Sequence, residues 1–335
     1  MNWYLQSGKD SDVLMNTINR FSRNLKDFKF NLKSDKEIEI LENKIKENLY
    51  QIGYGLKFLK LKDMDEITKQ SLVEKELVSK EFSKNKEGSI LINDEENICI
   101  MIGGKEHLEI QVFNSGLELK NTLNLAIEID KKFGEIYGYA VNKKYGFLTS
   151  SPDMLGTGLK AICTMHIPGL VKTNNTRNIL DTITNFGISI KKINDEDIKN
   201  QSDIYQISNK YTLGISEEEI VENVNIIAEK IIEQERKARR LLANESIKLE
   251  DIIYRSYGIL SNCRKISNEE VLRLLSNVKL GVDLGILDKL NDLKVQKLYL
   301  YTKDANLQKY FGEKYEKMEL DVKRAEIIKL IINKK

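Results

Sequence analysis

The chain is poor in the residues that build metal centres and disulfide frameworks. Its 335 residues include two histidines, three cysteines, two prolines and one tryptophan. Cys99, Cys163 and Cys263 lie far apart and form no CxxC pair, so a zinc site of the usual composition cannot be assembled and no metal site is predicted. An odd number of widely spaced cysteines favours reduced, buried thiols over disulfides.

A dominant charge and long apolar runs are also absent. The chain carries 53 basic and 51 acidic side chains, a formal net charge of +2, so no overall field attracts nucleic acid or an anionic membrane. No window approaches the ~18–20 apolar residues of a membrane span, and the N-terminus lacks the pattern of a signal peptide. We therefore expect a cytoplasmic protein with no nucleic-acid or membrane partner.

The pattern of apolar and polar residues changes along the chain. Residues 10–82 place apolar residues three and four apart, as in "EIEILENKIKENLYQI", which predicts helices. Residues 88–210 show β-branched alternation, as in "SILINDEENICIMIGGKEHLEIQVF", which predicts a mostly antiparallel sheet. Capping boxes at residues 216–219 and 267–270 predict two helix starts, and the chain beyond residue 244 has a helical pattern. The predicted fold class is α+β.

This change of pattern divides the chain into three predicted parts. Residues 1–85 form a helical N-terminal part, residues 86–245 form a domain built on the antiparallel sheet, and residues 246–335 form a helical C-terminal domain.

The segment "GFLTSSPDMLGTGLKA", residues 146–161, combines a proline, three glycines and several hydroxyls directly after a predicted strand. It has neither the GxxxxGK[ST] spacing of a Walker loop nor the GxGxxG of a dinucleotide fingerprint. On residue types alone it is a strand that ends in a glycine-supported turn, with Ser150 and Ser151 capping the loop backbone.

The order of the whole segment, followed by "HIPGL", resembles the active-site segment of the ATP:guanido phosphotransferases, whose usual form is close to GYLTSCPTNLGTGLRA. Residues 203–224 and 252–287, and the segments "RFSRNLKDFKF" and "NLQKYFGEKY", resemble the bacterial protein arginine kinase (McsB) branch of that family. The resemblance covers nearly the whole chain. It implies a guanido-kinase fold, in which a small helical N-terminal region precedes an antiparallel β-sheet flanked by helices, plus a C-terminal helical dimerisation domain.

The resemblance implies that the γ-phosphoryl group of ATP is transferred, with Mg²⁺, to a guanidinium. In this family arginines bind the phosphates and carboxylates hold the guanidinium. Compared with the family's SSRIR, Ile18 replaces the first phosphate arginine and Arg20 retains the second. Compared with NEEDHLR, which matches residues 103–109, Lys105 replaces the catalytic glutamate and Glu109 replaces another phosphate arginine.

The remaining family positions are mixed. The reactive cysteine of TSCP is Ser151, the arginine of GTGLRA is Lys160, and a histidine often found near the nucleotide is Glu76. Counting back from "IYQISN" places the family's RGxYGE on residues 191–196, so Lys191 replaces an arginine and Glu196 retains a carboxylate. The resemblance thus implies Glu196 and Ser151 as catalytic residues. It implies Arg20, Lys160, Lys191 and His107 as nucleotide-binding residues.

Strand periodicity places Lys105, His107, Glu109 and Gln111 on one polar face of a predicted strand. A carboxylate at a phosphate position repels ATP, and we expect Lys105 and Glu109 to pair with each other instead. The alternatives are a packed, hydrogen-bonded His107 and a solvated Glu196.

A second site is implied near the C-terminus, where the family reads RDxxRA and binds phosphoarginine. Residues 320–325 retain Asp321 and Arg324, whose i, i+3 spacing places both on one helix face. Two interpretations stay open, a phosphoarginine site and an intrahelical ion pair.

Two functions are compatible with these residues. In the first, the chain is a catalytically impaired pseudokinase, a regulatory or adaptor module of a stress-response system. The resemblance implies that it acts there as a homodimer with the ClpC unfoldase, the CtsR repressor and a McsA-type activator, on arginine or phosphoarginine proteins. In the second, it is an active ATP-dependent protein arginine kinase whose lysines replace arginines.

Overall fold

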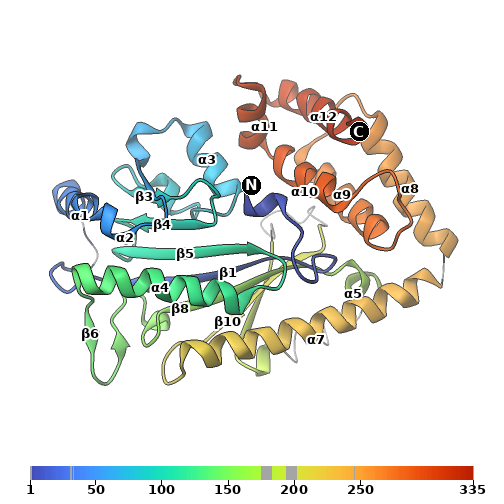
Figure 1. Cartoon of the computed structure of the whole chain (residues 1–335). Helices are drawn as coiled ribbons and strands as arrows, with labels where there is room; N and C mark the ends of the chain where they lie inside the picture. The colour runs from blue at the N-terminus through green and yellow to red at the C-terminus, as the bar shows by residue number, and fades with distance from the viewer. Residues whose placement is uncertain are drawn as a thin grey trace.

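A computed structural model describes residues 2–30, 32, 34–174, 183–193, 202–244 and 246–334 (Figure 1). Its centre is an eight-stranded antiparallel sheet with the strand order β2-β3-β4-β5-β1-β8-β10-β9. These strands are β1 (Leu14–Arg23), β2 (Lys57–Lys60), β3 (Ser89–Ile92), β4 (Ile98–Ile102), β5 (Leu108–Ser115), β8 (Leu159–His166), β9 (Ile188–Lys192) and β10 (Ile204–Asn209). A separate hairpin joins β6 (Val141–Asn142) to β7 (Gly146–Phe147). The predicted antiparallel sheet is confirmed.

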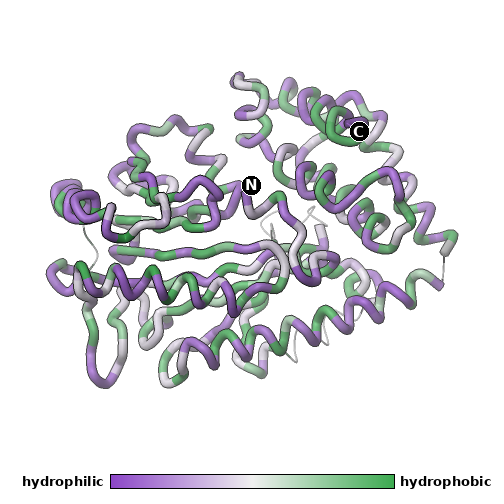
Figure 2. The backbone as a smooth tube through the Cα atoms, in the orientation of Figure 1, coloured by the Kyte–Doolittle hydropathy of each residue, from purple (hydrophilic) through white to green (hydrophobic). Residues whose placement is uncertain are grey.

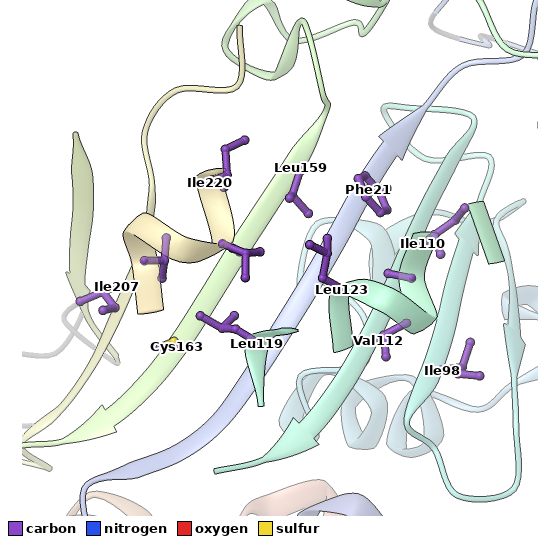
Figure 3. Packing of buried hydrophobic residues seen from close by; sticks show 14 of the residues in the cluster. Phe21, Ile98, Ile110, Val112, Leu119, Leu123, Leu159, Cys163, Ile207 and Ile220 are labelled. Atoms are coloured by element: carbon purple, nitrogen blue, oxygen red, sulfur yellow. The ribbon is translucent and has the colours of Figure 1, made fainter. Parts of the chain in front are cut away.

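Two long helices, α4 (Leu119–Tyr137) and α7 (Glu217–Ala243), lie along one face of the sheet (Figure 1). Alternate residues of the central strands point toward these helices and are buried, because a strand sends successive side chains to opposite faces. Figure 3 shows this core between the strands and the two helices; its labelled members include Phe21, Ile110, Val112, Leu159, Cys163, Ile207, Leu119 and Ile220. The opposite face of the same strands therefore carries the remaining side chains.

The predicted helix starts are confirmed. The Ser216 side chain accepts a hydrogen bond from the Glu219 N–H, and the Glu219 carboxylate accepts one from the Ser216 N–H, so α7 begins with a complete capping box. Ser267 caps α9 (Asn268–Asp283) by accepting from the Glu270 N–H. Figure 2 shows apolar residues recurring along α7 between hydrophilic ones, as expected for a helix with one buried face.

The N-terminal part differs from the prediction. It contains α1 (Asp35–Glu47), α2 (Leu49–Ile52), α3 (Glu66–Glu74) and the 3₁₀ turns η1 (Trp3–Leu5), η2 (Leu61–Asp63) and η3 (Phe82–Lys84), but also β1 at the middle of the sheet and β2 at its edge. β1 escaped the prediction because it lies between β5 and β8 and is buried on both faces. Polar residues such as Asn16 and Asn19 are buried there too, which hides the apolar alternation.

The C-terminal part is helical, as predicted. Beside α9 it comprises α8 (Ser246–Asn262), α10 (Asp292–Tyr301), α11 (Asp304–Phe311) and α12 (Lys317–Asn333), which enclose an apolar core of their own. The short α5 (Pro168–Lys172) and the 3₁₀ turn η4 (Pro152–Met154) complete the described elements. The exact domain limits given above stay a prediction. No helix within the described ranges is both long and apolar enough to cross a bilayer.

The C-terminal helices are joined to the N-terminal part through α3. The Glu74 carboxylate accepts hydrogen bonds from the Ala305 and Asn306 N–H groups, both at 2.9 Å, and so caps the start of α11. Ser71 donates to the Asn306 side-chain oxygen at 2.7 Å in the same contact. This contact places the turn after α3 beside the C-terminal domain.

The three cysteines are free thiols. Cys99 and Cys163 are fully buried and Cys263 is partly buried, and burial raises the pKa of all three thiols.

Candidate active site

The face of the sheet opposite α4 and α7 gathers the family positions. Arg20 on β1 is opposite Gln111 of β5 on one side and opposite Lys160 of β8 on the other. Paired residues on neighbouring strands point to the same face, so Arg20 and Lys160 share this one. The row Ile18, Ile162, Ser208 and Ser189 runs across four strands and places Lys191, two residues from Ser189, on the same face. Three of the predicted nucleotide-binding residues therefore share one sheet face.

The loop of residues 146–161 contains three glycines with positive φ, Gly146, Gly156 and Gly158, and other segments approach two of them closely. A side chain at Gly156 (φ 102°) would meet the Thr212 carbonyl oxygen at 2.3 Å, and one at Gly158 (φ 62°) would meet the Ser22 carbonyl oxygen at 2.7 Å. Any other residue would be strained at both positions, so the loop needs glycine there. The predicted glycine-supported turn at a strand end is confirmed, and the tight approach holds it against β1.

The Glu106 carboxylate also holds this loop, through hydrogen bonds to its backbone. It accepts hydrogen bonds from the Ser150 N–H at 2.8 Å and from the Ser151 N–H at 3.2 Å, and the Asn24 side chain also donates to it. Glu106 is 3% exposed, so this arrangement is protected from water. Sequence analysis gave no role to Glu106. The available signal was an acidic residue at the aspartate position of NEEDHLR.

Arg23 is a second anchor that sequence analysis missed. Its guanidinium forms a two-pronged ion pair with Asp130 of α4, at 2.9 and 2.8 Å, and donates to the Thr157 carbonyl oxygen at 2.8 Å. The guanidinium carbon also lies 3.6 Å from the centre of the Phe147 ring. Arg23 is 1% exposed, and it connects β1, α4 and both ends of the loop.

Glu109 pairs with Arg20, and not with Lys105 as predicted. The Glu109 carboxylate lies 3.7 Å from the Arg20 guanidinium, and both side chains are partly buried. The prediction was wrong because β5 begins at Leu108, so Lys105 lies in the preceding loop, exposed, and does not follow the strand alternation. The retained arginine therefore lies beside the residue that replaces another phosphate arginine, while its own Nε–H is buried without a hydrogen-bond partner among the described residues.

Lys160 and Lys191 occupy different environments on this face. The Lys160 ammonium donates to the Asn209 carbonyl oxygen at 2.6 Å. Burial, assisted by the positive charge of Arg20, lowers the pKa of Lys160. Lys191 is exposed on the edge strand β9. Neither side chain presents the planar two-pronged donor with which arginine holds a phosphate.

His107 and Ile18 are packed against neighbouring residues. The His107 Nδ1 atom accepts from the Leu25 N–H, the Nε2 atom lies 2.9 Å from the Lys29 carbonyl oxygen, and the ring contacts Phe28 and Phe30. His107 is therefore the packed, hydrogen-bonded histidine given above as the alternative. Binding a nucleotide through this ring would break one of these bonds. Ile18 is 4% exposed within an apolar cluster.

The remaining positions are dispersed. Ser151 is 9% exposed in the loop, and its N–H is held by Glu106. Glu76 lies in the turn after α3, beside the C-terminal domain. Glu196 lies outside the described residues.

The described charges of this face differ from the pattern with which the family holds a triphosphate. On the described part of the sheet face, the one retained arginine is paired with a carboxylate and the nearest lysine is held by a carbonyl oxygen. The same part of the chain contains no cluster of three or more acidic, histidine or cysteine side chains suited to a metal ion. The strands and the loop of this face match the family's fold, whereas its charged side chains differ from the family pattern.

Asp321 and Arg324 lie together on α12, inside a buried network. The Arg324 guanidinium donates to Asp321 at 2.6 Å, to the carbonyl oxygens of Ile266 and Thr302 at 2.8 and 2.7 Å, and to Asp304. Arg324 is 1% exposed. This is the intrahelical ion pair given above as the alternative, extended to neighbouring segments. Phosphoarginine binding by Arg324 stays a prediction, and it would require part of this network to open.

We expect Arg324→Ala to lower the free energy of unfolding by about 3 kcal/mol, because it leaves two carbonyl oxygens and two carboxylates without their common donor. Urea unfolding followed by circular dichroism measures this. The control is Lys237→Ala, which removes an exposed ion pair with Glu233 and should cost less than about 1 kcal/mol. An unchanged midpoint for Arg324→Ala would contradict a structural role and leave this arginine available to a ligand.

Comparison with known proteins agrees with this frame. Residues 37–238 match the family model "ATP:guanido phosphotransferase, C-terminal catalytic domain", and residues 246–335 match "Protein-arginine kinase McsB C-terminal domain". The protein-arginine kinase of Halothermothrix orenii is 38% identical over 335 residues, covering 99% of this chain and 96% of that protein. The protein-arginine kinase of Bacillus subtilis is 36% identical, covering 98% and 92%.

Solved structures show the same fold. The duplicated taurocyamine kinase from Schistosoma mansoni, solved with transition state analog components, aligns with a TM-score of 0.61 and 22% identity over 69% of this chain and 34% of that chain. Lombricine kinase aligns with a TM-score of 0.57 and 20% identity over 72% and 69%. The predicted α+β guanido-kinase fold with a helical C-terminal domain is therefore confirmed. The chain belongs to the McsB family of protein-arginine kinases, within the ATP:guanido phosphotransferases.

Proposed function

We propose that this chain is a protein-arginine kinase homologue whose phosphoryl transfer is severely impaired, and that it acts as a regulatory or adaptor module. The observation that carries the proposal is the ion pair between Arg20 and Glu109 on the sheet face. A carboxylate at a phosphate position opposes the anionic nucleotide and also offsets part of the positive charge of the one retained arginine. Two unit charges at 4 Å interact by about 4 kcal/mol at an effective dielectric constant of 20.

The catalytic positions support the same proposal. The family's catalytic glutamate would hold the positively charged guanidinium, whereas Lys105 has the opposite charge and is exposed in the loop before β5. A lysine there repels the substrate, as Glu109 repels the nucleotide. Ser151 keeps the size of the family's cysteine, but a hydroxyl ionises far less readily than a thiol. Glu196 is the one catalytic carboxylate that the family resemblance retains.

A role as a regulatory or adaptor module requires the folded scaffold but not the residues that transfer the phosphoryl group. The loop anchored by Glu106 and Arg23 and the helical C-terminal domain are both retained. We place the protein in the cytoplasm as a homodimer. Its proposed partners are those that the family resemblance implies, namely the ClpC unfoldase, the CtsR repressor, a McsA-type activator, and proteins carrying arginine or phosphoarginine.

A second candidate is an active ATP-dependent protein arginine kinase. It is favoured by the relatives, which carry the name protein-arginine kinase at 36–38% identity over almost the whole chain. In that case Lys160 and Lys191 stand in for arginines on the phosphates. Lys160→Ala and Lys191→Ala would then each abolish transfer.

The test measures Mg-ATP binding by calorimetry and phosphoryl transfer from radiolabelled ATP to an arginine-rich protein. The Bacillus subtilis relative, treated in parallel, is the positive control. We expect no binding at millimolar Mg-ATP and no phosphoarginine. Transfer by the wild-type chain that is lost in Lys160→Ala and Lys191→Ala would reject the impaired-kinase proposal and establish the second candidate.

A further inference from the structure

A groove in the C-terminal domain is lined mainly by helices α10 and α12, which Figure 1 shows at the orange and red end of the chain. Its volume is about 1020 Å³, at the upper end of the range for a small-molecule pocket and sufficient for a short peptide segment. Neither Arg20 nor Lys160 lines it, and neither Asp321 nor Arg324 does. The groove is therefore separate from both sites that the family resemblance implies.

Each of the two helices lines the groove with residues three and four positions apart, which is the spacing of one helix face. These residues include Val322, Ala325 and Lys329 on α12, and Leu293, Lys297 and Tyr301 on α10. Two helix faces side by side form a continuous strip, a shape that receives a segment of another chain.

Large apolar side chains in the groove are exposed to solvent. Val322, Leu330 and Tyr310 are 44%, 49% and 51% exposed. Exposed apolar side chains that gather in one groove among charged ones indicate a surface where a partner binds.

The charged side chains of the groove are almost all basic. Five are basic, namely Arg264, Lys294, Lys297, Lys329 and Lys334, and one, Glu326, is acidic. Glu326 pairs with Lys323 at 2.9 Å, and Lys323 does not line the groove, so this carboxylate already has its own partner. The Lys294 ammonium donates to the Ile332 carbonyl oxygen at 3.0 Å.

The other four basic side chains have no ion pair within the described part of the chain. The whole chain has a net charge of only +2, with 53 basic and 51 acidic side chains, so this concentration of unpaired positive charge is local. Lys297 on α10 and Lys329 on α12 are half-buried, so their alkyl stems contribute to the two walls while their charges remain unpaired.

We propose that this groove binds an acidic, amphipathic segment of a partner protein. The apolar side chains of such a segment would cover Val322, Leu330 and Tyr310, and its carboxylates would pair with the basic side chains of the two walls. Charge complementarity selects this occupant, because a neutral or basic segment would leave the four unpaired cations without partners. A nucleic acid strand is less suited, because aliphatic side chains such as Leu293 and Leu330 offer its bases no ring for stacking.

The proposal goes beyond the impaired kinase, because it assigns a partner surface to the C-terminal domain. It does not depend on the sheet face, since no residue of the groove belongs to a strand of the sheet. Peptide binding and phosphoryl transfer are measured separately, so the failure of one proposal leaves the other intact.

The test is the fluorescence anisotropy of a labelled peptide titrated with the full chain. The probe is a short helical peptide of glutamate and leucine, with the leucines three and four positions apart. One control peptide has lysine in place of glutamate, and a second has serine in place of leucine. We expect the probe to bind with a Kd on the order of 10 μM at low ionic strength, and each control peptide to bind at least about tenfold more weakly. Salt at about 0.5 M should weaken binding of the probe several-fold, because it screens the exposed charges.

Variants locate the peptide. Lys297→Glu combined with Lys329→Glu reverses one charge on each wall and should weaken binding at least about tenfold. The matched control is Lys289→Glu combined with Lys314→Glu, which makes the same change of net charge at exposed lysines of the same domain that do not line the groove. This control should bind within about twofold of the wild type. If circular dichroism shows that the charge reversal disturbs the fold, Lys297→Gln combined with Lys329→Gln replaces it and should weaken binding several-fold.

Several results would overturn the proposal. These are no saturable binding of the probe, equal binding of the lysine peptide, and equal losses in the groove variant and its matched control. Displacement of the probe by an oligothymidylate at lower concentration than by unlabelled peptide would identify a nucleic acid as the ligand, and displacement by free phosphoarginine would identify a phosphate. A groove variant that converts a dimer to a monomer in sedimentation would show that the groove is an interface between two copies of this chain.

Discussion

Replacing Glu109 by glutamine should increase the affinity of this protein for Mg-ATP by at least about tenfold, because the substitution removes the repulsive charge and releases Arg20 at the same time. Glu109 is partly buried, so solvent screens only part of its effect on a phosphate. Calorimetric titration with Mg-ATP, carried into the millimolar range, measures the change. Glu109→Arg should increase the affinity further, because it adds a donor suited to phosphate.

The control for this experiment is Glu118→Gln, which removes a carboxylate at the start of α4, away from the sheet face that carries Arg20. It should leave nucleotide affinity unchanged. We expect no phosphoarginine from either Glu109 variant alone, because Lys105 still occupies the position of the catalytic glutamate. Should Glu109→Gln bind Mg-ATP no better than the wild type, the ion pair with Arg20 would not be what prevents nucleotide binding.

Replacing Arg23 by methionine should lower the free energy of unfolding by about 3–5 kcal/mol. Removal of one partner of a buried ion pair leaves the other, Asp130, as an unpaired charge in an apolar environment. The substitution also removes the donor to the Thr157 carbonyl oxygen and the contact with the Phe147 ring. Urea unfolding followed by circular dichroism measures the loss.

Two further variants separate charge from packing at this position. Arg23→Met combined with Asp130→Leu should recover much of the stability, because no unpaired charge remains. Arg23→Lys should be intermediate, because lysine retains the charge but lacks the two-pronged geometry. If Arg23→Met cost less than about 1 kcal/mol, the pair with Asp130 would not be an important anchor of the loop.

The two sets of variants test two separate groups of residues, those that hold the loop and those that set the charge of the sheet face. The scaffold contacts, through Arg23 and Glu106, hold the loop of residues 146–161 in the arrangement that its glycines permit. The charges on the sheet face are then set by Arg20, Glu109 and Lys160. Because the two groups do not overlap, a chain can change its chemistry there while the frame remains folded.

The sequence by itself determined the fold class, the family, the helix starts at Ser216 and Ser267, and the glycine-supported loop. These features follow from local rules, since periodicity, capping and turn geometry depend on residues close together in the chain. The order of motifs also identified which family positions had changed, including Glu109 and Lys105.

Only the tertiary structure decided which of these residues meet. Arg23 and Asp130 are 107 positions apart, and their pairing depends on how β1 lies against α4. The partner of Glu109 depended on strand register and on where β5 begins, which moved it from Lys105 to Arg20. The docking of α3 on α11 is likewise a contact between distant segments that no local pattern encodes.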